Sequence, residues 1–501
     1  MSELLVIVIL IKCIYNFYVL PFDSIFVKDN EINNTDYHSI IIQNELYVNL
    51  SLGTPEQTFK TILKMDKYGF VIYENALNFE KSTSLEEVDD DLKIGWGSGF
   101  DYTPFKDNIY LSSYNSYSDF YNNKNNKSYN NITKTNKIVF LKIMPKQGTS
   151  YYFNEMFKKY GIIGLKYNSN QYFNAPEFIP SLKEIKEIQS YTFSLLFDNT
   201  LKDGFTDNNN KGYFIVGEDL TDSVEEKEKI KYVQCEVIGG ELWWDLKFDS
   251  IHTGKNDEKQ KNPTEYNEKK ITAEIIANYP YIIGTNEYFK YLNDTFFNNA
   301  IAKNYCSVTQ FRKHERFLYD YYSFVCDTQS KNFMDYLNNN FPDLIFEHKE
   351  LGMNFTLTKK DLFAYNSFDS SDTNLYFLVT NCLEKMYDNW YLGIPFLKKY
   401  RLSFNYDTKM IGFYKDNNKD KKEKSKGYNF FSSIFFKIIL IIILIIILII
   451  IIFVLGMLFQ KYFQKSRKKK ANELDDNYEY EPYSEQNNNN NIINNENDNI
   501  N

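Results

Sequence analysis

The sequence has few of the residues that fibrous, disulfide-rich and metal-binding proteins require. Its 501 residues include 20 Gly and 11 Pro, which excludes a collagen-like or proline-rich architecture. Five Cys without a CxxC spacing are too few for a disulfide scaffold, and four scattered His form no metal-binding motif. We therefore expect neither a metal ion nor another cofactor.

The chain also lacks an excess of positive charge. Its 57 Lys and Arg residues against 66 Asp and Glu residues give a formal net charge of −9, and no basic stripe runs through the main body. An acidic surface repels the phosphate backbone, so we expect no nucleic-acid partner. Aromatic residues, in contrast, are abundant: 42 Tyr and 42 Phe predict a packed core rather than a disordered chain.

Two apolar segments predict where the protein resides. Residues 1–21 contain an apolar run that only Lys12 and Asn16 interrupt, which is typical of a signal peptide or a signal anchor; without a visible A-x-A cleavage site, both alternatives stay open. Residues 438–459 are 22 consecutive uncharged residues, long enough to cross a bilayer as one helix. We predict a single-pass membrane protein with a lumenal or extracellular body and a low-complexity, disordered cytosolic tail, residues 460–501. The secretory route permits disulfides.

Between these segments the chain divides by composition. Residues 22–43 form a polar leader, and residues 415–437 form a stalk that begins rich in Lys, Asn and Asp. The body, residues 44–414, consists of short runs of alternating apolar and polar residues separated by turn residues, which predicts an all-β fold. Because the body is too long for one sandwich, we expect two lobes, residues 44–230 and 231–414.

Eight segments of the body, in the same order, resemble the pepsin-like aspartic proteases. They are SLGTPEQTF (51–59), FEKSTSLEEV (79–88), LKIGWGSG (92–99), YGIIGLKYNS (160–169), GYFIVGEDLTD (212–222), ELWWDLKFDSI (241–251), FPDLIFEHKELGMNFTLTKKDLFAY (341–365) and WYLGIPFLKKYRLSFNYDTKMIGF (390–413). The bias toward Asn, Lys, Tyr and Ile is similar to that of the plasmepsin branch. The resemblance covers about residues 44–414.

This resemblance implies a bilobal pepsin-like fold with a cleft between the lobes. Each lobe of the family supplies an Asp-Thr/Ser-Gly loop, and a flap closes over the substrate. Aspartic proteolysis needs two carboxylates about 3 Å apart that share one proton. The ionised carboxylate takes a proton from water, and the protonated one polarises the scissile carbonyl.

Both catalytic aspartates of the family are absent from this chain. Aligning the motifs places Lys64 and Ala277 at the two aspartate positions, so we assign no catalytic residue. The two loop glycines are replaced as well, by Asp66 and Tyr279. A bulky Tyr279 would disturb a site at which the two loops approach closely.

Two carboxylates are candidates for a noncanonical pair. Asp66 lies two residues after Lys64, and Glu274 lies three residues before Ala277. A dyad made from them requires a rebuilt loop, and the plainer alternative is that Asp66 is a solvated turn residue. Because a buried unpaired ammonium is costly, we expect Lys64 either to pair with Asp66 or a neighbouring carboxylate or to be exposed to solvent.

The flap and the cysteines complete the set of candidate residues. Ile94 stands where the family's flap Tyr belongs, and Trp96 near the hairpin tip either stacks on a bound chain or packs on the lobe. For the cysteines, the resemblance implies a disulfide between Cys326 and Cys382. A second bridge, Cys235 to Cys306, is a further candidate.

Three functions remain open. The first is a catalytically inactive, membrane-anchored pseudoprotease that binds a peptide or protein partner through its ectodomain. The second is an active aspartic endopeptidase with a noncanonical dyad. The third is a structural or adhesive surface protein that keeps only the fold, in which case side chains such as Tyr279 and Tyr281 should fill the cleft.

Overall fold

We analysed a computed structural model of the chain. Its elements lie in one compact unit that extends to Asp416. The described residues are 17–26, 44–88, 100–114, 132–145, 159–168, 175–198, 201–202, 205–207, 210–218, 230–238, 241–254, 266–314, 318–366, 371–382 and 389–414. The predicted flap residues Ile94 and Trp96, the stalk, the apolar span 438–459 and the tail lie outside them.

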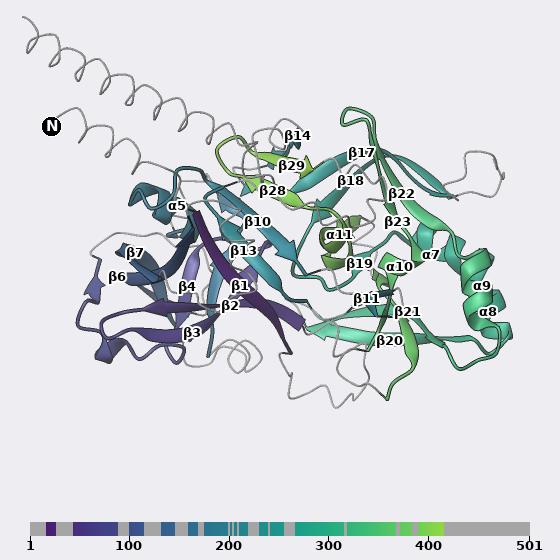
Figure 1. Cartoon of the computed structure of the whole chain (residues 1–501), viewed down its shortest axis with the longest axis horizontal. Coiled ribbons are helices and arrows are strands. Elements are labelled where there is room, and N and C mark those ends of the chain that lie inside the picture. The colour runs from purple at the N-terminus through teal and green to yellow at the C-terminus, as the bar shows by residue number, and fades with distance from the viewer. Residues whose placement is uncertain are drawn as a thin grey trace, which may run out of the picture. The chain divides into compact units, whose positions relative to one another are not determined.

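The first large sheet contains 13 strands (Figure 1). In spatial order these are β14 (Ile230–Gln234), β29 (Met410–Tyr414), β28 (Leu402–Asn405), β10 (Thr192–Phe197), β13 (Gly212–Val216), β1 (Phe17–Phe26), β2 (Asn44–Leu52), β3 (Gln57–Lys64), β8 (Gly161–Gly164), β4 (Phe70–Tyr73), β7 (Ile132–Pro145), β6 (Phe100–Tyr114) and β5 (Glu86–Glu87). The last strands of the described chain thus lie in the same sheet as the first ones.

The second large sheet also contains 13 strands. The order is β11 (Leu201–Lys202), β12 (Phe205–Asp207), β24 (Phe363–Tyr365), β25 (Asn374–Phe377), β21 (Leu318–Asp327), β26 (Val379–Cys382), β19 (Ile282–Ile283), β27 (Trp390–Leu392), β18 (Asn267–Ile275), β17 (Asp245–Gly254), β22 (Asp343–His348) and β23 (Met353–Leu357), with β20 (Cys306–His314) paired to β21. A small third sheet joins β15 (Val237–Ile238), β16 (Glu241–Leu242) and β9 (Tyr167–Asn168).

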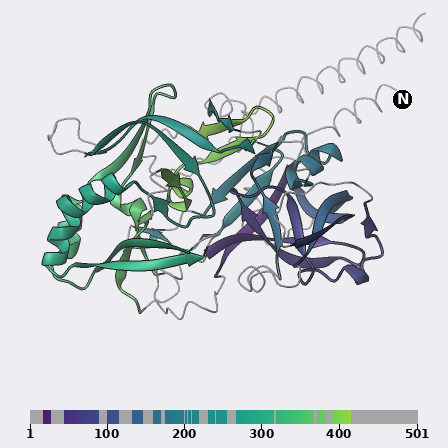
Figure 2. The same ribbon diagram turned by 180° about the vertical axis from the view of Figure 1, so that it is seen from behind.

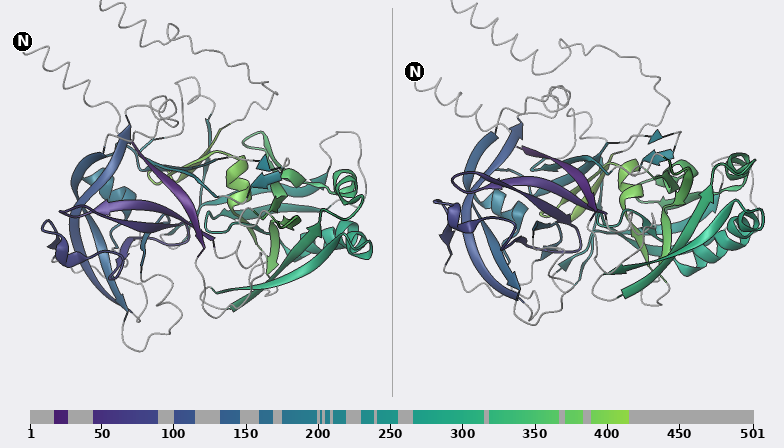
Figure 3. Two further views of the ribbon diagram at one scale, coloured as in Figure 1. Left: turned by 60° about the horizontal axis from the view of Figure 1, so that its bottom comes forward. Right: turned by 90° about the horizontal axis from the view of Figure 1, so that it is seen from below.

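Helices are short and few among the described residues. They are η1 (Phe79–Lys81), α5 (Phe178–Glu184), α7 (Asn286–Leu292), η2 (Asn293–Phe297), α8 (Asn298–Ala302), α9 (Phe333–Asn340), α10 (Lys359–Leu362) and α11 (Ile394–Lys399). The segments α7 to α9 lie together beside the second sheet (Figures 2 and 3). No described helix is long and apolar enough to cross a membrane. The predicted all-β fold class is confirmed.

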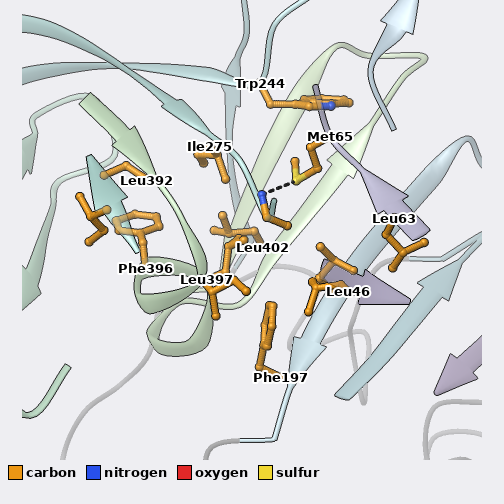
Figure 4. Packing of buried hydrophobic residues seen from close by; sticks show 14 of the residues in the cluster. Leu46, Leu63, Met65, Phe197, Trp244, Ile275, Leu392, Phe396, Leu397 and Leu402 are labelled. Carbon is orange, nitrogen blue, oxygen red and sulfur yellow. Dashed lines mark hydrogen bonds between the residues drawn. The ribbon is translucent and has the colours of Figure 1, made fainter. Parts of the chain in front are cut away.

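Aromatic and aliphatic side chains explain why these strands pack into sheets. All six residues of β10 are buried, as expected for a central strand covered on both faces. Phe193 of β10 stacks on Phe404 of β28, with ring centroids 4.8 Å apart, and Trp244 meets both rings edge to face. Figure 4 shows Trp244 above Met65 and Ile275 in this core. The core therefore connects residues from both ends of the chain.

Strand β1 begins inside the segment 1–21 that the sequence predicts as a signal peptide or signal anchor. β1 pairs with β13, where Leu20 lies opposite Phe214, and with β2, where Ser24 lies opposite Leu46. Leu20 is buried. Residues 17–26 thus form a strand of the first sheet.

The predicted disulfide between Cys326 and Cys382 is wrong. Cys306 bonds to Cys326, because the two lie directly opposite each other on β20 and β21. Cys382 lies opposite Tyr321, five residues along β21, which is about 17 Å from Cys326 and too far for a disulfide. The candidate pair Cys235–Cys306 is wrong as well: Cys306 is already bonded, and Cys235 is a buried free thiol.

Candidate functional site

Two loops with the same strand environment define the candidate site. Loop A, residues 65–69, connects β3 to β4, and loop B, residues 276–281, connects β18 to β19. At loop A, β8 is parallel to β3 and antiparallel to β4. At loop B, β27 is parallel to β18 and antiparallel to β19. The two loops are therefore built by the same topology in two different sheets.

One glycine lies against the backbone of each loop. A Cβ at Gly164, the last residue of β8, would lie 2.4 Å from the carbonyl carbon of Tyr68 in loop A. A Cβ at Gly393, the residue after β27, would lie 2.0 Å from the carbonyl oxygen of Tyr281 in loop B. Real Cβ atoms do not approach backbone atoms so closely. Only glycine therefore allows the backbone at these two positions to lie this near to the loop.

Loops A and B contact each other through hydrogen bonds. The backbone N–H of Met65 donates to Oδ1 of Asn278 at 2.9 Å, and the backbone N–H of Ala277 donates to the Met65 sulfur at 3.3 Å, the dashed line in Figure 4. The Asn278 amide also donates to the Asp66 carboxylate. Asn278 is thus the side chain that joins the two loops, and the sequence analysis did not single it out. The sequence did contain a signal for Asn278, because this residue occupies the Thr/Ser position of the second expected Asp-Thr/Ser-Gly motif.

Lys64, at the first expected aspartate position, is held in an ion pair. Its ammonium lies 2.5 Å from a carboxylate oxygen of Glu45 on β2, and the side chains are 12% and 4% exposed, respectively. The predicted pairing of Lys64 with a neighbouring carboxylate is confirmed, and the partner is Glu45. An ammonium fixed in this way cannot replace a carboxylate as a base for water.

Ala277, at the second expected aspartate position, is buried in the hydrophobic core. Its methyl group can neither accept nor donate a proton. The two family positions therefore carry a paired cation and an apolar side chain, and neither supplies acid–base chemistry.

The remaining carboxylates beside the loops are Asp66, Glu274 and Asp245. Asp66 has a side chain that is 37% exposed and lies 3.3 Å from the ammonium of Lys67. Glu274 lies opposite Asp245 on β17 and opposite Tyr391 on β27, so these three residues form one row across the second sheet. A carboxylate on each side of the inter-loop contact is therefore available.

Burial dominates the electrostatics of Glu274. Burial, opposed by the positive charge of Lys166 and reinforced by the negative charges of Asp66 and Asp245, raises the pKa of Glu274 to about 8. Lys166 is itself buried and lies over the ring of Trp243, 3.3 Å from its centroid. A pKa of about 8 favours the neutral form of Glu274 at neutral pH.

Tyrosine side chains border loop B. Tyr279 stacks on Tyr281, with ring centroids 5.6 Å apart, and meets Tyr391 edge to face at 6.1 Å. The ring of Tyr281 also contacts the ring of Tyr321 on β21, and Tyr281 is buried. Tyr279 and Tyr391 are partly exposed. The glycine position of the second motif thus carries an aromatic side chain that is packed on its neighbours.

The site has no metal-binding constellation within the described ranges: no group of three or more His, Cys, Asp or Glu side chains there could hold a metal ion. The predicted flap residues Ile94 and Trp96 lie outside those ranges. In comparisons with known proteins, no protein-family model matches the chain, and no curated protein matches it significantly.

Proposed function

We propose that this chain is a catalytically inactive relative of the pepsin-like aspartic proteases, of the plasmepsin-like branch, which binds a peptide or protein partner through a two-lobed ectodomain. Residues 438–459 anchor it to a membrane, with the ectodomain lumenal or extracellular. The main support is the pair of topologically equivalent loops, A and B, which meet through Met65 and Asn278. The eight motif segments, which follow one another in the family's order, agree with it.

The observation that carries the loss of activity is the chemistry at Lys64 and Ala277. A paired ammonium and a methyl group leave no proton-sharing carboxylate pair at the two equivalent positions. The loops themselves are intact and in contact, so the fold has lost its reactive groups without losing the frame that held them. By the resemblance, a frame of this kind borders the cleft in which the family binds an extended peptide, so we propose binding rather than cleavage.

The test uses the full-length protein, purified in detergent and assayed at acidic pH against a broad peptide library. Cleavage is followed by mass spectrometry, and binding by fluorescence polarisation. We expect binding of a subset of peptides and no cleavage. Cleavage that pepstatin blocks would overturn the proposal; a folded, disulfide-bonded protein that neither cleaves nor binds would favour the third alternative, a structural or adhesive surface protein.

A restoration variant sharpens this test. Lys64→Asp and Ala277→Asp, combined with Asp66→Gly and Tyr279→Gly, would rebuild both Asp-x-Gly loops. Lys64→Asp also places a new carboxylate near Glu45, so Glu45→Gln is added to remove that repulsion. Pepstatin-sensitive cleavage by this variant, absent from the wild type, would show that only the reactive groups are missing.

One observation favours a second candidate function, an aspartic endopeptidase with a noncanonical dyad. Burial raises the pKa of Glu274 to about 8, and the negative charge of Asp66, whose side chain is 37% exposed, contributes to this rise. Acid–base hydrolysis requires two interacting carboxyl groups, one of which holds its proton. In that case Asp66→Asn and Glu274→Gln each abolish cleavage, whereas Asp245→Asn, the neighbour in the same row, leaves it. Equal residual cleavage in all three variants would exclude the dyad.

A further inference from the structure

The two large sheets exchange segments in both directions. Residues 402–414 follow the last strand of the second sheet, yet β28 and β29 pair with β10 and β14 of the first sheet. Conversely, the β11–β12 hairpin lies between β10 and β13 of the first sheet in sequence, yet it belongs to the second sheet. Figure 1 shows both exchanges: β28 and β29 lie beside β10, and β11 lies among the strands of the second sheet.

The hairpin is attached to the second sheet by backbone and side chains. β12 runs parallel to β24, with Thr206 opposite Ala364 and Asp207 opposite Tyr365. Phe205 is 4% exposed, and its ring meets that of Tyr365 edge to face, with centroids 5.9 Å apart. A buried aromatic anchor next to a strand pairing indicates a permanent attachment rather than a passing contact.

The base of the hairpin stays in the first sheet. β10 and β13 are antiparallel neighbours up to Phe197 opposite Gly212, and the N–H of Asp198 donates to the carbonyl of Lys211 at 2.8 Å. A Cβ at Gly212 would lie 2.1 Å from the carbonyl oxygen of Leu196, so the two strands are closely apposed just before the hairpin leaves the sheet. Both ends of the connection are therefore fixed.

We propose that the β11–β12 hairpin is a strap that fixes the two sheets at one separation. The return of β28 and β29 and the contact between loops A and B also join the two sheets. The strap is a further attachment, made by a different segment, and each separate attachment restricts rotation of one sheet against the other. This inference goes beyond the proposed function and does not rest on it, because it concerns the rigidity of the frame and not what the frame binds.

The strap can be tested by measuring the distance between the sheets. Spin labels on Glu56→Cys and Lys331→Cys, both exposed positions, report on the first and second sheet units in the full-length protein. Cys235 and the native disulfide are kept, and the other cysteines are replaced by Ser. We expect one narrow distance distribution for the otherwise wild-type chain. Phe205→Ser should broaden it and should increase hydrogen exchange in β24.

A matched control separates release of the strap from general loss of stability. Phe197→Ser removes a Phe that is 5% exposed from β10, on the same arm but within the first sheet, and it should leave the distribution narrow. If Phe205→Ser prevents folding, a second variant decides: Thr206→Cys with Ala364→Cys joins directly opposite residues. When oxidised, that pair should form a disulfide without changing the distribution.

Two results would overturn the proposal. One is a distribution that stays narrow in folded Phe205→Ser, which would make the hairpin a mere extension of the sheet edge. The other is a distribution that shifts when the Thr206→Cys and Ala364→Cys pair is oxidised, which would show that the two strands are not paired at rest.

Discussion

Loop A and loop B share one topology but differ in how each fills its central position. At loop A the position is large and charged, and Glu45 neutralises it. At loop B it is small and apolar, and the surrounding residues are the buried Asn278 and a group of tyrosines. The comparison shows that the strand frame, the supporting glycine and the inter-loop contact do not require one kind of side chain at the central position.

The difference also separates two kinds of electrostatic environment. Loop A has its buried charge in a close ion pair. Beside loop B, strand β18 carries a carboxyl group, Glu274, whose pKa is raised chiefly by burial. Removal of a partner should therefore be most damaging at loop A, whereas the response to pH should come from loop B.

The largest expected effect is at the ion pair of loop A. Glu45→Ala removes the carboxylate that pairs with the largely buried Lys64 ammonium, and breaking a buried pair costs about 3–5 kcal/mol. The measurement is the free energy of unfolding from urea denaturation. Lys64→Met combined with Glu45→Leu, which removes both charges, should recover most of that loss; a double variant as unstable as Glu45→Ala would contradict the assignment of the loss to the broken ion pair.

The next largest effects are expected at the two supporting glycines, where matching substitutions allow loops A and B to be compared directly. Gly393→Ala and Gly164→Ala each place a Cβ against loop backbone, at 2.0 and 2.4 Å, and overpacking of this kind costs about 1–3 kcal/mol. We expect the larger loss of unfolding free energy for Gly393→Ala. Gly254→Ala is the control, because its nearest neighbour would be a side-chain atom at 3.7 Å. Equal effects at all three positions would argue against a special role of the loop glycines.

The inter-loop contact should show a loss of similar or smaller size. Asn278→Ala leaves the buried N–H of Met65 without an acceptor, which costs about 1–3 kcal/mol. Asn278→Asp keeps an acceptor for Met65 but places a second carboxylate next to Asp66, so it should be destabilised at neutral pH and recover in acid. Thermal unfolding at two pH values measures both effects. An Asn278→Asp variant as stable as the wild type at neutral pH would show that the loops do not meet as described.

A different kind of effect is expected beside loop B, a change in the pH dependence of stability. The pKa of Glu274 in the folded state, about 8, lies above its ordinary value of 4.5. The neutral form is therefore favoured by folding, and the stability from this group is fully present below pH 4.5 and is lost as the pH rises toward 8. Glu274→Gln should flatten this part of the curve of unfolding free energy against pH. An unchanged slope in the variant would assign the pH dependence to other groups.

Much of the fold could be predicted because it depends on local pattern. The alternating runs predicted strands, and the described body is built from them. The ion pair of Lys64 could be anticipated because a buried ammonium needs a counter-ion, although its partner, Glu45, is 19 residues away and had no local signal. The disulfide could not be predicted, because only the register of β20 and β21 places Cys306 opposite Cys326. The raised pKa of Glu274 depends on its burial, which cannot be inferred from a single sequence.

The return of residues 402–414 to the first sheet has a consequence for synthesis. β28 lies next to β10, and Phe404 covers Phe193, so the first sheet lacks an inner strand until the last part of the body has been made. An N-terminal half emerging from the ribosome cannot close its own core, and it exposes the edge of β10 in the meantime. The order of synthesis therefore differs from the order of folding in this chain. Its first sheet can be completed only after its last strands have been synthesised.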